Sequence, residues 1–108
     1  MIKPSRVKFI SEELEMQFNQ LKDEDPIKKG IIKAIKELEE NAFSGIQIPK
    51  HLFPKEYVQK YGINNLWKYD LPNAWRLIYT VSPEDEVQLI SAILEWFDHK
   101  DYERRFSY

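Results

Sequence analysis

Three side chains in the last third of this 108-residue chain have types suited to charge stabilisation and proton transfer: Arg76, His99 and Tyr102. An arginine guanidinium presents a fork of N–H donors that matches two phosphate oxygens. Histidine is the usual proton-transfer residue near neutral pH, and tyrosine can donate or orient a proton. His99 and Tyr102 are three apart, so they share a face if this stretch is helical.

Each of these three residues also has a purely structural interpretation. Arg76 could form a surface ion pair with Asp70 or Glu95. Tyr102 could pack against a neighbouring aromatic side chain. Its functional alternative to proton transfer is to stack on a nucleic-acid base. His99 could simply cap a helix. Residue types and spacing alone therefore leave the site and the structural interpretation open.

Further basic or titratable side chains that could bind phosphate or reach such a site lie in a central loop, on the strand after it and in the C-terminal segment: Lys50, His51, Lys55, Lys68, Lys100, Arg104 and Arg105. The last three alternate with acidic residues, so a solvated helix face explains them as well. The carboxylate of Glu95 is a candidate base, although it suits a pairing with Arg76 equally. The two histidines lack ligand-type spacing and the chain has no cysteine, so we predict no metal site and no cofactor.

Composition sets limits on the class of protein. A chain of this length with 43% hydrophobic residues predicts one globular domain spanning residues 1–108. Lys and Arg number 16 against 18 Asp and Glu, which gives a net charge of −2. A nucleic-acid binder would therefore need a local positive patch, because the molecule as a whole is not attracted to phosphate.

No stretch of the sequence predicts targeting to a membrane. The N-terminus lacks the apolar run of a signal peptide, and the longest apolar-rich stretch, 87–97, is too short to span a bilayer. We expect a cytoplasmic protein without a membrane partner.

The first half of the chain predicts a short strand and two helices. Residues 7–10 are β-prone, and Ser11 is a suitable N-cap for an amphipathic helix. A second amphipathic helix starts at Asp25-Pro26 and is expected to end at Ser44-Gly45. With so short a turn between them, the two helices should pack as an antiparallel hairpin.

The second half predicts strands after a long connection, 46–64, in which residues 55–60 could form a helical turn or two. Strands are expected at 66–71 and 75–81. The segment 87–97 fits helical spacing too, but its continuous apolar run after a hairpin-like turn favours a strand buried on both faces. Asp98 should cap a final helix, 99–106.

These elements predict an α+β fold of order β-α-α-β-β-β with a short C-terminal helix. Strands that bracket a helical hairpin suggest an antiparallel-rich sheet of about four strands, covered on one face by helices.

The segments 66–69 (LWKY), 73–81 (NAWRLIYTV) and 93–105 (ILEWFDHKDYERR) resemble the C-terminal half of RelE/ParE-type toxins. In that superfamily a strand of the form W-(K/R)-x-R/L precedes x-R-L-I/V-Y-x-(V/I), and the chain ends near H-x-x-Y. The resemblance is specific over residues 66–106 and generic in the helices. It implies the toxin of a type II toxin–antitoxin pair, held inactive by an antitoxin protein.

The resemblance also implies an activity. RelE-like members are metal-independent endoribonucleases that cleave mRNA, usually on the ribosome, whereas ParE-like members act on DNA gyrase. It places Arg76 at the active site and matches His99 and Tyr102 to catalytic or base-stacking positions. Some members take a base from the central loop, where Lys50, Lys55 and Glu56 lie. The function expected is a toxin-type mRNA endoribonuclease. The alternative is a non-catalytic binding protein of the same fold: a topoisomerase inhibitor or an inactive toxin relic.

Overall fold

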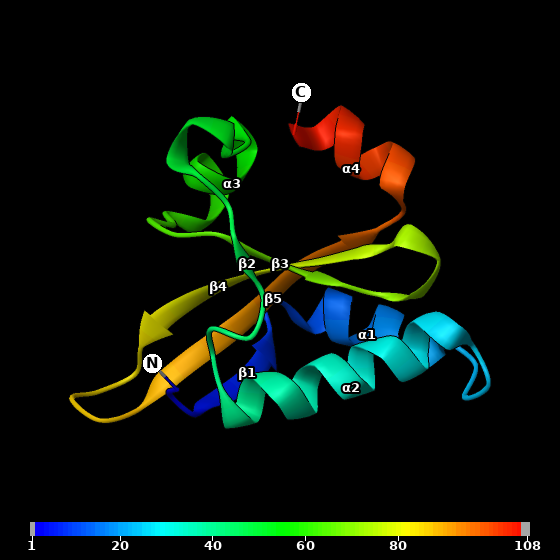
Figure 1. Cartoon of the computed structure of the whole chain (residues 1–108), viewed down its shortest axis with the longest axis horizontal. Helices are drawn as coiled ribbons and strands as arrows, with labels where there is room; N and C mark the ends of the chain where they lie inside the picture. Colours follow the sequence, from blue (N-terminus) through cyan, green and yellow to red (C-terminus); the bar gives the residue numbers. More distant parts are fainter. Residues whose placement is uncertain (1, 107–108) are drawn as a thin grey trace.

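The structure, a computed structural model, describes residues 2–106 and shows an α+β fold (Figure 1). Its one sheet separates helices α1 and α2 on one side from α3 and α4 on the other. The elements are β1 (Ser5–Phe9), α1 (Glu12–Gln20), α2 (Pro26–Glu40), β2 (Ile46–Gln47), η1 (Lys50–Leu52), α3 (Lys55–Tyr61), β3 (Trp67–Asp70), η2 (Pro72–Ala74), β4 (Arg76–Pro83), β5 (Leu89–Phe97) and α4 (His99–Phe106). No helix within residues 2–106 has the length and apolarity needed to cross a membrane.

The sheet has five strands in the order β1-β5-β4-β3-β2, which corrects the expectation of about four antiparallel-rich strands. Three neighbouring pairs are antiparallel, but β1 runs parallel to β5, so the sheet is mixed. The additional strand, β2, consists of two residues, too few to carry a period-2 pattern. Strand direction across a long connection is not encoded in such a pattern either, so the parallel pair could not be read from the sequence.

Helices α1 and α2 begin at the caps expected from the sequence, Ser11 and Asp25. The N–H of Leu14 donates to Ser11 Oγ (3.1 Å), and the N–H of Ile27 donates to Asp25 Oδ1 (2.8 Å). The expected end of α2 was wrong: the helix stops at Glu40, because Asn41 takes an extended conformation.

Gly45 is required for close chain packing rather than for a helix cap. A Cβ at this position would lie 2.5 Å from the carbonyl oxygen of Lys68 and 2.7 Å from the hydroxyl of Tyr79. Real Cβ atoms do not approach other atoms so closely, so only glycine lets the chain pass from α2 over β3 here.

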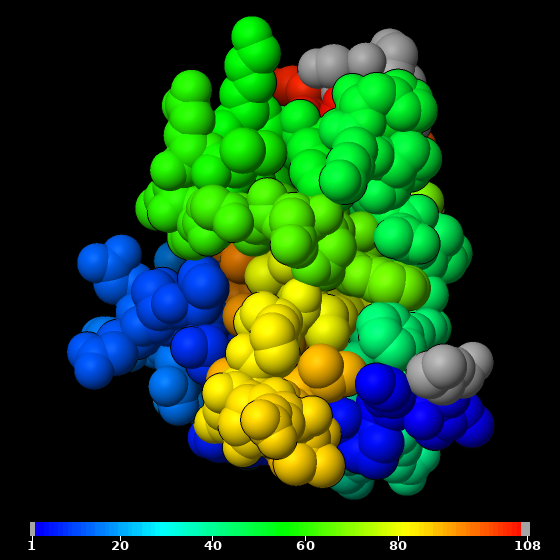
Figure 2. Space-filling model, turned by 90° about the vertical axis from the view of Figure 1, so that its left-hand side faces the viewer, coloured from blue at the N-terminus to red at the C-terminus, as the bar shows by residue number. Residues whose placement is uncertain are grey.

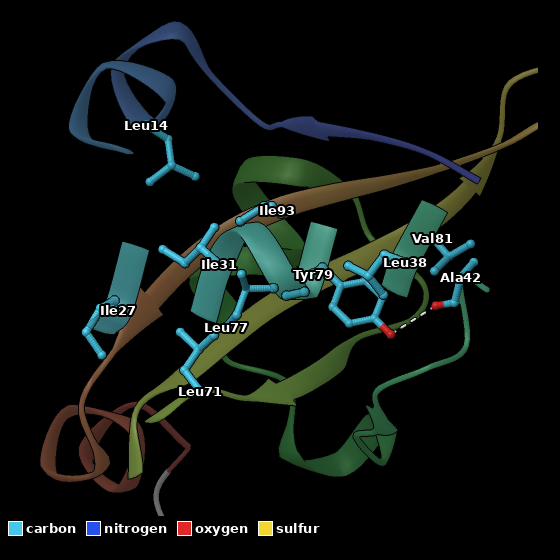
Figure 3. Close-up of a cluster of buried hydrophobic side chains, with 11 residues drawn as sticks. Leu14, Ile27, Ile31, Leu38, Ala42, Leu71, Leu77, Tyr79, Val81 and Ile93 are labelled. Carbon is cyan, nitrogen blue, oxygen red and sulfur yellow. Dashed lines mark hydrogen bonds between the residues drawn. The ribbon is translucent and has the colours of Figure 1, made fainter. Parts of the chain in front are cut away.

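The face of the sheet under α1 and α2 holds one apolar cluster (Figure 3), with these fully buried members: Leu14, Ile27, Ile31, Ala34, Leu38, Ala42, Leu71, Leu77, Tyr79, Val81 and Ile93. The hydroxyl of Tyr79 donates to the carbonyl of Ala42 (2.9 Å) and accepts from the N–H of Gly45 (3.0 Å). The polar tip of this buried ring is therefore satisfied by backbone groups.

The opposite face is also covered, so the expectation of helices on one face only was wrong. Its buried cluster consists of Ile48, Tyr57, Leu66, Ile78, Leu94, Phe97, Tyr102 and Phe106. Because β4 and β5 carry apolar side chains on both faces, the second face also has to be shielded from water, and α3 and α4 supply the aromatic side chains that do so.

The strand expected at 87–97 is confirmed from Leu89 onward, and its centre is buried on both faces. Val87 instead lies fully exposed in the β4–β5 turn. The short helices expected after residue 55 and residue 98 are also present as α3 and α4. The N–H of Asp101 donates to Asp98 Oδ1 (2.9 Å), which is the expected cap of α4.

Candidate functional site

Two cations from neighbouring strands meet one aromatic ring where the sheet borders α4. Lys68 Nζ of β3 lies 5.1 Å from the centre of the Tyr102 ring, and the guanidinium carbon of Arg76, at the start of β4, lies 5.8 Å from it. We call this group, Lys68, Arg76 and Tyr102, the cationic corner. Both cations lie within the range at which an aromatic face attracts positive charge, so the ring helps to hold them together.

Arg76 points to the α3/α4 side of the sheet, away from α1 and α2, as its alternation with Leu77 predicts. Its side chain is 18% exposed. Arg76 Nε lies 3.1 Å from Asp70 Oδ1, but the N–H is not aimed at that oxygen, so the contact is an ion pair without a directed hydrogen bond. One terminal nitrogen donates to the carbonyl of Trp75 (3.1 Å). Of the two partners considered from the sequence, Asp70 is the one observed.

Tyr102 is buried, with 3% of its surface exposed, and its ring stacks on Phe106 at 4.7 Å between centroids. Phe97 packs beside it at 6.2 Å. A ring in this environment has no free face for a nucleic-acid base, so the base-stacking role considered for Tyr102 is wrong. The tyrosine instead forms the platform beneath Lys68 and Arg76.

His99 occupies the first position of α4 and is about half exposed. Its Nε2 contacts the carboxylate of Glu103 one helical turn later. Its backbone is close to the cationic corner, because Phe97, two residues earlier, pairs with Arg76 in the sheet. The structure thus brings Arg76 and Tyr102 into contact, whereas the imidazole lies with Glu103 on the exposed side of α4.

A second polar group joins α3, β5 and α4. Arg105 Nη1 donates to both oxygens of Glu95, at 3.0 and 2.7 Å, and Tyr57 donates its hydroxyl hydrogen to the same carboxylate. Glu56 lies 3.3 Å from Arg105. We call Tyr57, Glu95 and Arg105 the Glu95 network. Because both Glu95 oxygens accept bonds from it, this carboxylate is a poor candidate for a free general base.

A β-bulge aims Glu95 at this network. Ile78 lies opposite Glu95 and Tyr79 lies opposite Ile93, so Leu94 is an extra residue in β5. Leu94 therefore fills the apolar cluster on the α3/α4 face while Glu95 reaches the same face. Bulges often redirect a side chain in this way. The bulge leaves no local periodic signal in the sequence.

Burial and charge shift the ionisation of this network. Burial raises the pKa of Tyr57, and the hydrogen bond to Glu95 raises it further, so the phenol stays protonated. Burial lowers the pKa of Arg105, but the charge and hydrogen bonds of Glu95 together with Tyr57 and Glu56 raise it by more, so the net shift is upward. The network therefore consists of a carboxylate that accepts from a neutral phenol and from a permanent cation.

The remaining candidates are spread over the surface. Lys50 and Lys55 line a cleft beside α3, and His51 is exposed in η1. Lys100 and Arg104 are exposed on α4, where Arg104 lies 3.3 Å from Asp101. Arg104 and Arg105 thus have acidic neighbours, as a solvated helix face would. Among the ion pairs of residues 2–106, Lys68 has no carboxylate partner.

The residues described, 2–106, contain no group of three or more His, Cys, Asp or Glu side chains arranged to hold a metal ion. Sequence reasoning missed Tyr57. The signal that could have found it is its position in the 55–60 helix, where Tyr57 and Tyr61 are four apart and share one helix face.

Comparison with protein-family models, with curated proteins and with solved structures returned no match for this chain.

Proposed function

We propose that this chain is a toxin-type endoribonuclease resembling the RelE/ParE superfamily, acting in the cytoplasm on mRNA, on the ribosome, and neutralised by an antitoxin protein. The observation that carries the proposal is the cationic corner, in which Lys68 and Arg76 converge on the buried ring of Tyr102.

Two like charges held close together favour an anion between them. Asp70 is the carboxylate that contacts Arg76, and its side chain is 60% exposed, so water screens its charge. Lys68 adds a second positive charge without a carboxylate partner among the described residues. A phosphate is the anion that suits this pair, because the guanidinium fork matches two of its oxygens and the ammonium supplies a point charge.

RNA cleavage without a metal requires three contributions: a base that removes the 2′-hydroxyl proton, positive charge on the phosphorane, and an acid that protonates the leaving 5′-oxygen. Arg76 and Lys68 supply the charge in this proposal. His99, two residues after Phe97, supplies proton transfer. It does so once bound RNA has displaced its imidazole from the contact with Glu103. The 2′-hydroxyl gives its proton to His99 and its oxygen attacks phosphorus, the bond from phosphorus to the 5′-oxygen breaks, and the 5′-oxygen takes a proton from water. The products are a 2′,3′-cyclic phosphate and a 5′-hydroxyl.

The pairing of two arginines of α4 with carboxylates favours a second candidate, a non-catalytic binding protein of the same fold. Arg104 and Arg105 face carboxylates, and the net charge of the chain is −2. Such a surface attracts RNA weakly and suits a protein partner such as a topoisomerase.

The test is cleavage of mRNA on translating ribosomes by wild type, Arg76→Ala and the control Arg104→Ala. Removing a charged contact made in the transition state should lower the rate roughly 10²–10³-fold in Arg76→Ala. Arg104→Ala, with its exposed ion pair, should stay within about 2-fold of wild type. Equal cleavage by wild type and Arg76→Ala would remove the corner from the mechanism. No cleavage by wild type, together with inhibition of gyrase supercoiling, would establish the second candidate.

A further inference from the structure

A cleft of about 440 Å³ lies beside α3, between that helix, η1 and the segment that leads to β3. Phe53, Val58 and Ile63 contribute its apolar surface, Lys50 and Lys55 its charge, and Gln59 a side-chain amide. Figure 2 shows the green segment around residues 50–65 covering the upper part of one face of the molecule, above the yellow β4–β5 turn. A volume of this size falls in the range typical of small-molecule sites.

The charge of this cleft differs from that of the whole chain. The chain has more acidic than basic residues, yet no carboxylate lines the cleft. Within residues 2–106, neither Lys50 nor Lys55 takes part in an ion pair. Glu56, between the cleft-lining Lys55 and Val58, turns instead toward Arg105 on the other side of α3. The cleft therefore offers two uncompensated positive charges above an apolar floor.

We propose that this cleft binds one nucleotide of a single-stranded RNA substrate, an inference that rests on the proposed function. The base packs on the ring of Phe53 and against Val58 and Ile63. The amide of Gln59 offers both a donor and an acceptor to the edge of the base. Lys50 and Lys55 hold the adjoining phosphate.

A nucleotide accounts for all three kinds of lining group. An alkyl carboxylate would use the apolar floor and one lysine but leave the amide without a role. Inorganic phosphate would use only the lysines. A nucleotide has a flat heteroaromatic base with polar edges and an attached anion, so it uses the apolar floor, the amide and the two lysines together.

The direct test is binding of the four nucleoside 5′-monophosphates, followed by backbone amide shifts in NMR, with inorganic phosphate and octanoate as comparison probes. We expect shifts centred on residues 50–64, and an affinity at least about 10-fold above that of inorganic phosphate, since base stacking adds to the charged contact. Equal affinity for phosphate alone, or tighter binding of octanoate than of every nucleotide, would overturn the inference.

Variants locate the site. The double variant Lys50→Ala/Lys55→Ala should weaken nucleotide binding by about 10- to 100-fold, because it removes two charge-assisted contacts. Val58→Asp places a carboxylate in the floor at a position that is 43% exposed, so folding should survive while binding is lost. The matched control Lys29→Ala/Lys33→Ala changes two exposed lysines of α2 and should bind as wild type does. Nucleotide binding unchanged by the first two variants would also overturn the inference.

Nucleotide binding in the cleft and RNA cleavage are measured separately, so either proposal can fail without the other. In Arg76→Ala the mononucleotide-induced shifts centred on residues 50–64 should remain, because the cationic corner is not part of the cleft. Arg76-dependent cleavage without any mononucleotide binding would overturn the cleft alone. Mononucleotide binding at residues 50–64 in a protein that never cleaves RNA would support the cleft and overturn the proposed cleavage.

Discussion

The two faces of the sheet are both buried, but they differ in what lies among their apolar side chains. Under α1 and α2 three buried side chains have hydroxyls that bond to backbone or to one another: Tyr79 with Ala42 and Gly45, and Ser5 with Leu38 and Ser91. Under α3 and α4 the apolar cluster borders two groups of charged side chains, the cationic corner and the Glu95 network.

This difference indicates a division of roles. Placing charges at the edge of a core costs desolvation free energy. Replacing such a charged pair with two apolar residues often leaves a protein equally stable. The Glu95 network at least satisfies its charges, since Arg105 and Tyr57 surround the carboxylate. The cationic corner does not, because the exposed Asp70 contacts Arg76 while Lys68 has no carboxylate partner among the described residues. We therefore assign stability chiefly to the α1/α2 face and ligand binding to the α3/α4 face.

The largest effect is expected on the α1/α2 face. Leu38 of α2 is completely buried, so Leu38→Ala should lower the free energy of unfolding by about 2–5 kcal/mol through lost burial and a cavity. Ile32→Ala changes a 41% exposed side chain of the same helix and should cost less than about 1 kcal/mol. Urea unfolding of both variants measures the difference. Similar losses would show that burial of Leu38 under α2 is not what stabilises this face.

Alkaline pH should weaken both faces, because each contains a tyrosine that resists ionisation. Burial raises the pKa of Tyr79 to about 12, although the bond from the Gly45 N–H acts in the opposite direction. A phenol that ionises near pH 10 in the unfolded chain and near pH 12 in the folded protein stabilises the fold fully below pH 10. This contribution, about 3 kcal/mol for a shift of that size, is lost as the pH rises through 12.

Absorbance of tyrosinate at 295 nm, combined with urea unfolding between pH 9 and 12, tests this expectation. The loss of stability should be smaller in Tyr79→Phe, and part of it should remain because the pKa of Tyr57 is raised as well. Normal titration of every tyrosine near pH 10 in a protein that stays folded would contradict the account.

The smallest effect is expected for the Glu95 network. Its two charged side chains are about a third exposed, so a double-mutant cycle of Glu95→Gln and Arg105→Met should give a coupling of about 1 kcal/mol in unfolding. RNA cleavage by Glu95→Gln should stay within about 3-fold of wild type, because this carboxylate holds α4 in place. A loss of cleavage as large as that of Arg76→Ala would instead make Glu95 the general base.

Much of the fold could be predicted from local patterns. Caps at Ser11, Asp25 and Asp98 and the apolar run of β5 fixed where most elements begin and what type they are. The parts of the fold that could not be predicted depend on contacts between distant segments. The parallel pairing of β1 with β5, the two-residue strand β2 and the second covered face leave no local periodic signal.

The candidate site was predictable only in part, for a similar reason. Alternation along β4 placed Arg76 on the face away from α1 and α2, which the structure bears out. The partner choice between Asp70 and Glu95 depended on contacts between distant segments, because Tyr57 of α3 and Arg105 of α4 engage Glu95. Burial of Tyr102 depended on Phe97 and Phe106, and spacing alone could not show that they enclose its ring.

We propose that Lys68 and Arg76 bind an RNA phosphate, and the side-chain Nε–H resonances of the arginines report such binding. A short 2′-O-methyl RNA, which cannot be cleaved by attack of the 2′-oxygen, is titrated into the labelled protein. We predict a saturable shift of the Arg76 Nε–H signal that is absent in Lys68→Ala or at least about 10-fold weaker in affinity, while the signal of Arg105, held by Glu95, stays in place. An unmoved Arg76 signal at an RNA concentration that shifts Arg104 or Arg105 would contradict the account.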